Sequence, residues 1–311
     1  YSGLVSGDIF TGSYTGAFSD KNVGTGKTVN ITPSYSGADV NNYSVTDQSS
    51  TTADISAKAL TATASASDKT YDGGTTASTT LTFTGLVGSE TLGQTVGSTF
   101  DNKNVGSNKT VTVNSITLAD GSGLAANYSI SAGQTTTADI TAKALTVSGI
   151  TASNKMYDGN TVATLSSSNV TYSGIVSGDS FAGSFSGSFS DKNIGTGKTV
   201  TITSSYSGSD VSNYSVTDQS STTANITSRP LDVTGITVFG LTVNNKEYDG
   251  TVTAPLKTDN ISYSGLVEGD DFTGSYSGVF ADANVGNGKT VTITSTYSGA
   301  DAGNYTVTDQ S

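Results

Sequence analysis

The sequence contains no cysteine, no histidine and no tryptophan, and only one methionine and three prolines among its 311 residues. The absence of cysteine excludes disulfides and thiolate metal sites. Without histidine, the commonest general base and the commonest metal ligand are both missing, and a Ser-His-Asp triad cannot be built. A glycine-rich phosphate loop followed by a helix is also missing. We therefore expect that the protein is not an enzyme and has no catalytic residue, no metal site and no cofactor.

Clusters of positive charge and long apolar runs are absent as well. The chain has 14 Lys and Arg against 26 Asp and Glu, which gives a formal net charge of −12. Nucleic-acid binding needs a basic patch or stripe, so we expect no nucleic-acid partner. No run has the roughly 20 apolar residues of a membrane helix, and no signal peptide opens the chain. We expect no membrane insertion in this segment.

A short motif recurs three times and organises the rest of the chain. Each copy has the pattern Lys-x-Tyr-Asp-Gly, and the copies begin at residues 69, 155 and 246, so they are 86 and then 91 residues apart. Such a period predicts a tandem array of like domains. We expect each Tyr to be a core anchor, each Asp to cap a turn and each Gly to adopt positive φ. The motif residues are Tyr71, Asp72, Gly73, Tyr157, Asp158, Gly159, Tyr248, Asp249 and Gly250.

The chain begins and ends within the repeat pattern. Its first eight residues, Tyr-Ser-Gly-Leu-Val-Ser-Gly-Asp, match the segment that begins at Tyr172 and the segment that begins at Tyr263. We divide the chain into four parts and call them repeats 1 to 4. They are the C-terminal part of a repeat (1–56), two complete repeats (57–142 and 143–228) and a repeat that lacks its last strand (229–311).

Alternating apolar residues predict strands. Phe272, Tyr276 and Phe280 fall on one face of a strand because successive side chains point to opposite faces. In repeat 2, Leu92 and Val96 replace the rings without breaking the pattern, which favours a buried core over an exposed platform for sugar stacking. Burial of Tyr14, Phe185 and Tyr276 would support the core interpretation. We expect the glycines between the rings to leave room for them.

A turn and a second strand follow each aromatic strand. The turns have the pattern Asp/Asn-Lys/Ala-Asn-Val/Ile-Gly, and the strands alternate Val or Ile with Thr. We expect the lysine that opens each strand to cover apolar surface while its ammonium stays in water. An isopeptide crosslink from these lysines is a weaker alternative, because the recurring acids Asp54 and Asp139 are expected to point outward. The lysines are Lys27, Lys109, Lys198 and Lys289.

These patterns predict an all-β protein. About seven short strands in each repeat, with no helical period, favour a small antiparallel β-sandwich of immunoglobulin type. The segments that join the repeats, such as residues 55–60 and 140–145, contain neither Gly nor Pro. The third junction carries Pro230. We therefore expect the chain to pass almost straight between domains and to form an elongated, stiff rod.

Two further groups of residues allow more than one interpretation. The acidic cluster Glu268, Asp270 and Asp271 has oxygen ligands of the kind that Ca²⁺ takes, but the equivalent positions in other repeats are poorer in acids, which favours a hairpin turn. The pattern Asn-Tyr-Ser/Thr is a glycosylation acceptor, and the simpler interpretation is a loop Asn before a strand. It occurs at Asn42, Asn127, Asn213 and Asn304.

The whole motif set resembles the YDG/MBG-type repeats of large bacterial surface proteins. Lys-x-Tyr-Asp-Gly, Asn-Val-Gly, Gly-Lys-Thr-Val, Asn-Tyr-Ser-Val and Ala-Asp-Ile-x-x-Lys-Ala-Leu occur together in one period. The resemblance covers the entire chain. Such repeats occur in filamentous-haemagglutinin-like adhesins, often exported by two-partner secretion, and in other extracellular fibres.

The resemblance implies a structural stalk or spacer of a secreted protein at the bacterial cell surface, which projects adhesive parts or links cells in a biofilm. Its expected partners are the neighbouring repeats of the same chain. One alternative is a carbohydrate- or matrix-binding module, whose partners would be host or matrix glycans. Another alternative is a subunit of a polymerising extracellular filament, whose partners would be other copies of the fibre.

Overall fold

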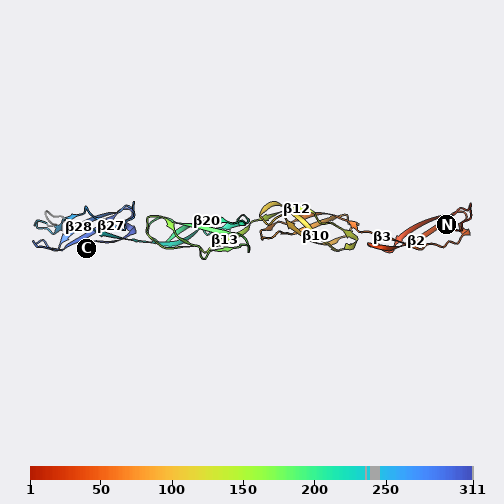
Figure 1. Ribbon diagram of the computed structural model, residues 1–311, viewed down its shortest axis with the longest axis horizontal. Coiled ribbons are helices and arrows are strands. Elements are labelled where there is room, and N and C mark those ends of the chain that lie inside the picture. Colours follow the sequence, from red (N-terminus) through yellow and green to blue (C-terminus); the bar gives the residue numbers. More distant parts are fainter. Residues whose placement is uncertain (235–236, 239–245, 310–311) are drawn as a thin grey trace. The chain divides into compact units, whose positions relative to one another are not determined.

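The computed structural model describes residues 1–234, 237–238 and 246–309. Nearly all regular structure in these residues is β, as the sequence predicts (Figure 1). The helical elements described are 3₁₀ turns of three residues: η1 (Val40–Asn42), η2 (Ala125–Asn127), η3 (Val211–Asn213) and η4 (Ala302–Asn304). No helix in the described ranges is long and apolar enough to cross a membrane. The chain divides into two compact units, Tyr1–Lys143 and Ala144–Ser311.

The first unit holds repeats 1 and 2. Repeat 1 has one antiparallel sheet with the order β1 (Thr11–Phe18), β2 (Gly24–Ser36) and β3 (Ser50–Ile55). Repeat 2 has a five-stranded sheet with the order β6 (Lys69–Thr70), β12 (Thr135–Thr141), β10 (Gly106–Asp120), β9 (Leu92–Phe100) and β7 (Thr76–Ala77). Two strand pairs complete it: β5 (Thr61–Ala66) with β8 (Thr79–Thr84), and β4 (Lys58–Ala59) with β11 (Tyr128–Ser129).

The second unit holds repeats 3 and 4. The main sheet of repeat 3 has the order β15 (Lys155–Met156), β22 (Ser221–Thr227), β20 (Gly195–Ser207), β19 (Ala182–Phe189) and β16 (Val162–Ala163). Its smaller sheets are β18 (Thr171–Ser173), β13 (Lys143–Ser148) and β21 (Tyr214–Thr217), and β14 (Thr151–Ala152) with β17 (Leu165–Ser166). Repeat 4 has two three-stranded sheets and one strand pair. The first sheet has the order β25 (Thr253–Ala254), β28 (Thr273–Phe280) and β29 (Val291–Ser298), and the second has the order β27 (Ser262–Ser264), β23 (Arg229–Thr234) and β30 (Tyr305–Thr308). The pair is β24 (Thr237–Val238) with β26 (Leu256–Lys257).

The sheets are mixed, which corrects the expectation of purely antiparallel sheets. The short motif strand β15 pairs parallel with β22, and β6 pairs parallel with β12 in the same way. In repeat 4, β23 also pairs parallel with β30. Parallel neighbours need a long crossover connection, and most of the repeat lies between the two strands of each pair. The motif strand therefore closes the repeat by joining its beginning to its end.

The alternating residues line the core of each main sheet. Phe189 of β19 lies opposite Val200 of β20, and both are buried, as is Ile226 of β22. Repeat 2 buries Phe100, Val111 and Ile140 at the equivalent positions. Because the core face takes every second residue, the intervening Thr and Ser residues lie on the opposite face.

The first half of the aromatic strand is less buried than we expected. Tyr14 is exposed, with 53% of its surface accessible, while Phe185 and Tyr276 are half-buried. These rings lie beyond the core and pack edge-on against a neighbouring ring instead, as Tyr276 does against Tyr297 at 6.1 Å between centroids. The intervening glycines do leave room for rings, since a Cβ at Gly274 would lie 2.7 Å from the Tyr263 hydroxyl.

The lysine ammonium groups that open the second strands are bonded to the preceding turn and do not stand in water. Lys109 Nζ lies 2.9 Å from Asp101 Oδ1, and its side chain is only 9% exposed. The hydrogen bond from Lys109 lowers the pKa of Asp101 below its ordinary value. The equivalent ion pairs are Lys27 with Asp20, Lys198 with Asp191 and Lys289 with Asp282.

Candidate functional site

The Lys-x-Tyr-Asp-Gly motif forms a tight loop in each of repeats 2 to 4. In repeat 2, Asp72 Oδ1 accepts a hydrogen bond of 2.8 Å from the backbone N–H of Gly74, and Gly73 has a φ of 82°. In repeat 3, Asp158 Oδ1 accepts from Asn160 N–H at 3.2 Å, and Gly159 has a φ of 78°. Positive φ is unfavourable for residues with a Cβ, so the loop needs glycine at this position.

The motif lysine holds the loop together, a role that the motif pattern by itself does not indicate. Lys155 Nζ donates to Asp158 Oδ1 at 2.7 Å and to the carbonyl oxygens of Asn160 at 2.8 Å and Val162 at 3.0 Å. It also lies 5.5 Å from the centroid of the buried Phe189 ring. Lys69 makes the equivalent contacts in repeat 2. The lysine thus fixes the loop on the end of the core.

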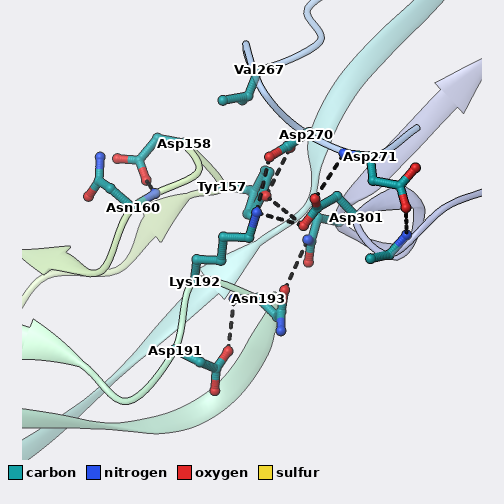
Figure 2. Close-up of polar contacts among 12 residues, drawn as sticks. Tyr157, Asp158, Asn160, Asp191, Lys192, Asn193, Val267, Asp270, Asp271 and Asp301 are labelled. Carbon is teal, nitrogen blue, oxygen red and sulfur yellow. Dashed lines mark hydrogen bonds and ion pairs between the residues drawn. The ribbon is translucent and has the colours of Figure 1, made fainter.

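The motif tyrosines of repeats 2 and 3 are buried, since Tyr71 is 1% and Tyr157 is 0% exposed. Residues of the next repeat cover Tyr157. Its hydroxyl donates to Asp270 Oδ2 at 2.9 Å and lies 3.3 Å from Asp301 Oδ1 (Figure 2). Its ring packs edge-to-face on Tyr305, with centroids 5.5 Å apart. Tyr157 therefore anchors the junction between repeats 3 and 4 as well as its own repeat.

Lys192 brings a positive charge from repeat 3 to two carboxylates of repeat 4. Its ammonium lies 2.7 Å from Asp301 Oδ1 and 3.1 Å from Asp270 Oδ1 (Figure 2). The hydrogen bond to Asp301, followed by that to Asp270, raises the pKa of Lys192, and the same lysine lowers the pKa of Asp301. Burial and the hydrogen bond to Asp270 raise the pKa of Tyr305 to about 12. Lys192, Asp301 and Tyr305 therefore keep their ordinary charge states at neutral pH.

Asn304 fixes the turn of repeat 3 on repeat 4 through both ends of its side-chain amide. Its Oδ1 accepts from the Ile194 backbone N–H at 3.0 Å, and its Nδ2 donates to Asn193 Oδ1 at 3.1 Å. Asn304 is 3% exposed. A buried amide with partners at both ends specifies one docking geometry, because any shift leaves polar groups unpaired.

The same arrangement occurs in the first unit, between repeats 1 and 2. Asn127 Oδ1 accepts from Val23 N–H at 2.9 Å, and its Nδ2 donates to Asn22 Oδ1 at 3.1 Å. Lys21 lies 3.1 Å from Glu90. Glu90 also accepts from the Tyr128 hydroxyl at 2.6 Å, as Asp270 does from Tyr305 at 2.5 Å. Each unit thus contains one junction built from an Asn clasp and a Lys–carboxylate pair.

The hydrophobic core of the second unit continues across its junction. The buried cluster that contains Tyr157, Phe189 and Ile226 of repeat 3 also contains Leu231 and Tyr305 of repeat 4. Only Ser228 separates strand β22 from strand β23, so the chain enters the next sheet directly after leaving the previous one. The junction is therefore a packed interface and not a linker.

Tyr248 is the exception among the predicted core anchors, because it is 68% exposed. Its neighbours keep the loop geometry: Asp249 Oδ1 accepts from Thr251 N–H at 2.9 Å, and Gly250 has a φ of 76°. Tyr157 is buried by residues of the repeat that follows it, and no described residue covers Tyr248 in that way. The anchor role therefore depends on a neighbouring repeat, whereas the turn does not.

Members of the two remaining predicted groups also lie at the junctions. Asp270 of the acidic cluster is bonded to Lys192 and two tyrosines, and no set of three acidic residues in the described ranges is placed to hold a metal ion. Among the glycosylation acceptors, Asn127 and Asn304 form the clasps, Asn213 is fully buried and Asn42 is exposed. The loop interpretation was thus incomplete for Asn127 and Asn304.

The sequence does contain a signal for these junctions. The Lys-Asn-Val/Ile turn, the Gly-Asp or Ser-Glu hairpin and the Asn-Tyr pair recur together in the repeats. Each group is explained within one repeat as a turn or a strand start. The contacts that connect these groups across two repeats, such as those of Lys192 and Asn304, are seen only in the structure.

Comparison with known proteins agrees with the tandem repeats. The model of a family described as the YDG domain matches residues 1–53, 56–138, 141–224 and 232–311. No curated protein and no solved structure matches the chain. The four matches confirm the prediction of a tandem array of YDG-type repeats.

Proposed function

The chain belongs to the YDG domain family, and we propose that its repeats are the structural stalk or spacer of a bacterial cell-surface adhesin or extracellular fibre. On this proposal the repeats project adhesive parts of the protein from the surface or link cells in a biofilm. Their main partners are the neighbouring repeats of the same chain. The protein is extracellular, and it performs no catalysis.

The recurring junction is the observation that carries this proposal. A spacer must hold neighbouring domains in a fixed relative orientation, which requires interfaces that do not slide. The Asn304 clasp and the Asn127 clasp use the same atoms for the same contacts in two different pairs of repeats. A binding module would not need such contacts between its copies.

The proposal extends to the architecture of the repeats. The main sheet and the smaller strand groups of each repeat pack as a small sandwich, although their parallel strand pairs differ from the antiparallel sheets of immunoglobulin domains. Successive repeats form an elongated, stiff rod. The single residue between β22 and β23 and the continuous core beside it support this stiffness.

Small-angle X-ray scattering tests the spacer proposal. The expected result is a particle whose maximum dimension is close to four times the length of one repeat and does not change with temperature below unfolding. A matched variant, Asn304→Ala, should broaden the distance distribution because it removes the clasp. A compact particle, or a flexible chain with no preferred length, would contradict the spacer function.

Exposed rings favour one second candidate, a carbohydrate- or matrix-binding module. Tyr14 is 53% and Tyr1 is 67% exposed, and their hydroxyl oxygens lie 3.1 Å apart. Rings with polar edges suit stacking against sugars. A glycan array with the intact chain tests this function, with Tyr14→Ser as the matched control. Binding that this substitution abolishes would support the module.

A further inference from the structure

The turn between strands β9 and β10 of repeat 2 differs from the corresponding turns of the other repeats. It has Asp101 followed by Asn102, whereas the other repeats have Ser or Ala followed by Asp. The positions are equivalent in the structure, because Asp101 N–H donates to the Thr110 carbonyl at 3.0 Å, as Ser19 N–H does to Thr28 at 2.9 Å. An acid and an amide in repeat 2 thus replace the single acid that pairs with lysine elsewhere. The corresponding pairs are Ser19 and Asp20, Ser190 and Asp191, and Ala281 and Asp282.

The side chain of Lys109 contacts both of these residues and is only 9% exposed. Its Nζ lies 2.8 Å from Asn102 Oδ1 and 2.9 Å from Asp101 Oδ1. An amine held this close to a carbonyl group needs only a small movement to reach the carbonyl carbon. In the other repeats the equivalent lysine meets a carboxylate, whose negative charge resists attack. A carboxamide can instead transfer its acyl group to an amine and release ammonia.

Asp101 touches both of the nitrogen atoms that such a transfer involves. Its Oδ1 faces the Lys109 ammonium, and its Oδ2 accepts from Asn102 Nδ2 at 3.2 Å. The hydrogen bond from Lys109 lowers the pKa of Asp101, so Asp101 is a carboxylate at neutral pH. It is therefore placed to take a proton from one nitrogen and to give it to the other.

A backbone N–H polarises the amide carbonyl. Asn104 N–H donates to Asn102 Oδ1 at 3.0 Å, which also fixes the orientation of the amide, because Nδ2 cannot accept this bond. The same N–H would stabilise the negative charge that develops on Oδ1 during attack. Asp139, one of the recurring acids, lies elsewhere, since its Oδ1 accepts from Asn108 N–H at 2.7 Å.

We propose that Lys109 and Asn102 form an intramolecular isopeptide bond, with Asp101 as the acid–base residue. Asp101 takes a proton from the Lys109 ammonium and donates it to Nδ2 of Asn102. The Nζ–Cγ bond forms, the Cγ–Nδ2 bond breaks, and ammonia leaves with a second proton of Nζ as ammonium. The reaction occurs once in each chain, so it does not make the protein an enzyme. This proposal does not rest on the spacer function.

Intact mass spectrometry of the folded chain tests the proposal. We expect each chain to lose the mass of one ammonia molecule. After unfolding, trypsin should cut after Lys103 but not after Lys109, and the fragments on either side of Lys103 should stay joined through the new bond. The lysines of the other repeats should remain cleavable and are internal controls. They are Lys27, Lys198 and Lys289.

Two results of this experiment would overturn the proposal. One is an unchanged mass after prolonged incubation of the folded chain. The other is loss of ammonia with Lys109 still cleavable by trypsin, since a succinimide at Asn102 has the same mass but leaves the lysine free.

Two variants assign the roles of the residues. Lys109→Arg keeps the positive charge but removes the amine, so the mass loss should disappear. Asp101→Ser places in repeat 2 the residue that repeats 1 and 3 have at this position, so the chain should still fold. We expect the crosslink to form about a hundredfold more slowly in this variant, as is typical when an acid–base group is removed. Formation at the parent rate would contradict the role of Asp101.

Discussion

Gly159 and Gly250 hold the same place in two copies of the motif but differ in their surroundings. Their φ angles are 78° and 76°, so both backbones disfavour a side chain by about 1–2 kcal/mol. A Cβ at Gly159 would also lie 2.8 Å from Val267 Cγ1, across the junction, whereas nothing lies within 4 Å of one at Gly250. The same substitution therefore separates the cost of the turn from the cost of the junction.

We expect Gly159→Val to destabilise repeat 3 more than Gly250→Val destabilises repeat 4. Both variants strain the turn, and only the first also displaces Val267 of the next repeat. Hydrogen exchange read by mass spectrometry gives the opening free energy of each repeat separately. Equal losses of opening free energy in the two variants would mean that Val267 is displaced at no energetic cost. A fully stable Gly159→Val repeat would show the turn assignment to be wrong.

The pH dependence of the junction follows from Lys192 and Asp301. Lys192 lowers the pKa of Asp301 below 3.8, so the stability that this carboxylate contributes is present above 3.8 and is lost as pH falls through the lowered value. Its partners raise the pKa of Lys192 above 10.5, so that contribution is present below 10.5 and is lost as pH rises through the raised value. The junction should therefore be strongest between these limits.

Thermal unfolding of the parent chain and of a Lys192→Met variant measures this dependence. Carboxylates that do not contact Lys192 also titrate at low pH, but they cancel in the difference between the two melting temperatures. We expect the difference to be constant near neutral pH and to shrink toward zero in strong acid and in strong base. A difference that does not change with pH would mean that the ion pair contributes nothing.

At the scale of single elements, the strands were predictable and their partners were less so. The alternation of Val200 and Ile202 with Thr is local, and a half-buried strand follows from it directly. The parallel pairing of β15 with β22 joins the two ends of a repeat, and no local pattern records it. The junction was missed for the same reason, since Asn304 meets its partners only through tertiary contacts.

The link between β22 and β23 offers a test at this scale. Inserting Gly-Ser-Gly after Ser228 should loosen the Asn304 clasp while leaving the β20–β22 ladder intact, because the added residues free repeat 4 from the strand that leads into it. Faster exchange of the Ile194 amide, whose acceptor is Asn304, would report the loss. The same insertion after the exposed Asp259 is the control, and it should leave that amide protected.

At the scale of the whole molecule, stability is shared between neighbouring repeats. Tandem arrays behave as sums of repeat stabilities and interface terms between neighbours. We expect Tyr157→Ala to cost about 3–5 kcal/mol, as for other large buried rings, and to weaken repeat 4 as well as repeat 3. Tyr248→Ala, at the equivalent exposed position, should be nearly neutral.

Urea unfolding combined with exchange measurements on each repeat checks this expectation. The important result is whether Tyr157→Ala also lowers the free energy of unfolding of repeat 4, since a purely local anchor would leave repeat 4 unchanged. The tandem array was predictable from the spacing of the motif. The dependence of one repeat on the next was not, because Tyr157 and Tyr248 stand in the same local sequence pattern but differ in exposure by 68% of their surface.

The direction in which repeats cover each other has a consequence for biosynthesis. Tyr157 is closed over by Asp270 and Tyr305, which lie later in the chain. A polypeptide that leaves the ribosome or a secretion pore with its N-terminus first exposes Tyr157 before its cover exists. Tyr157 of repeat 3 therefore remains uncovered until repeat 4 has emerged. In this pair the later repeat completes the earlier one, so we expect repeat 3 to reach its final stability only after repeat 4 has been synthesised.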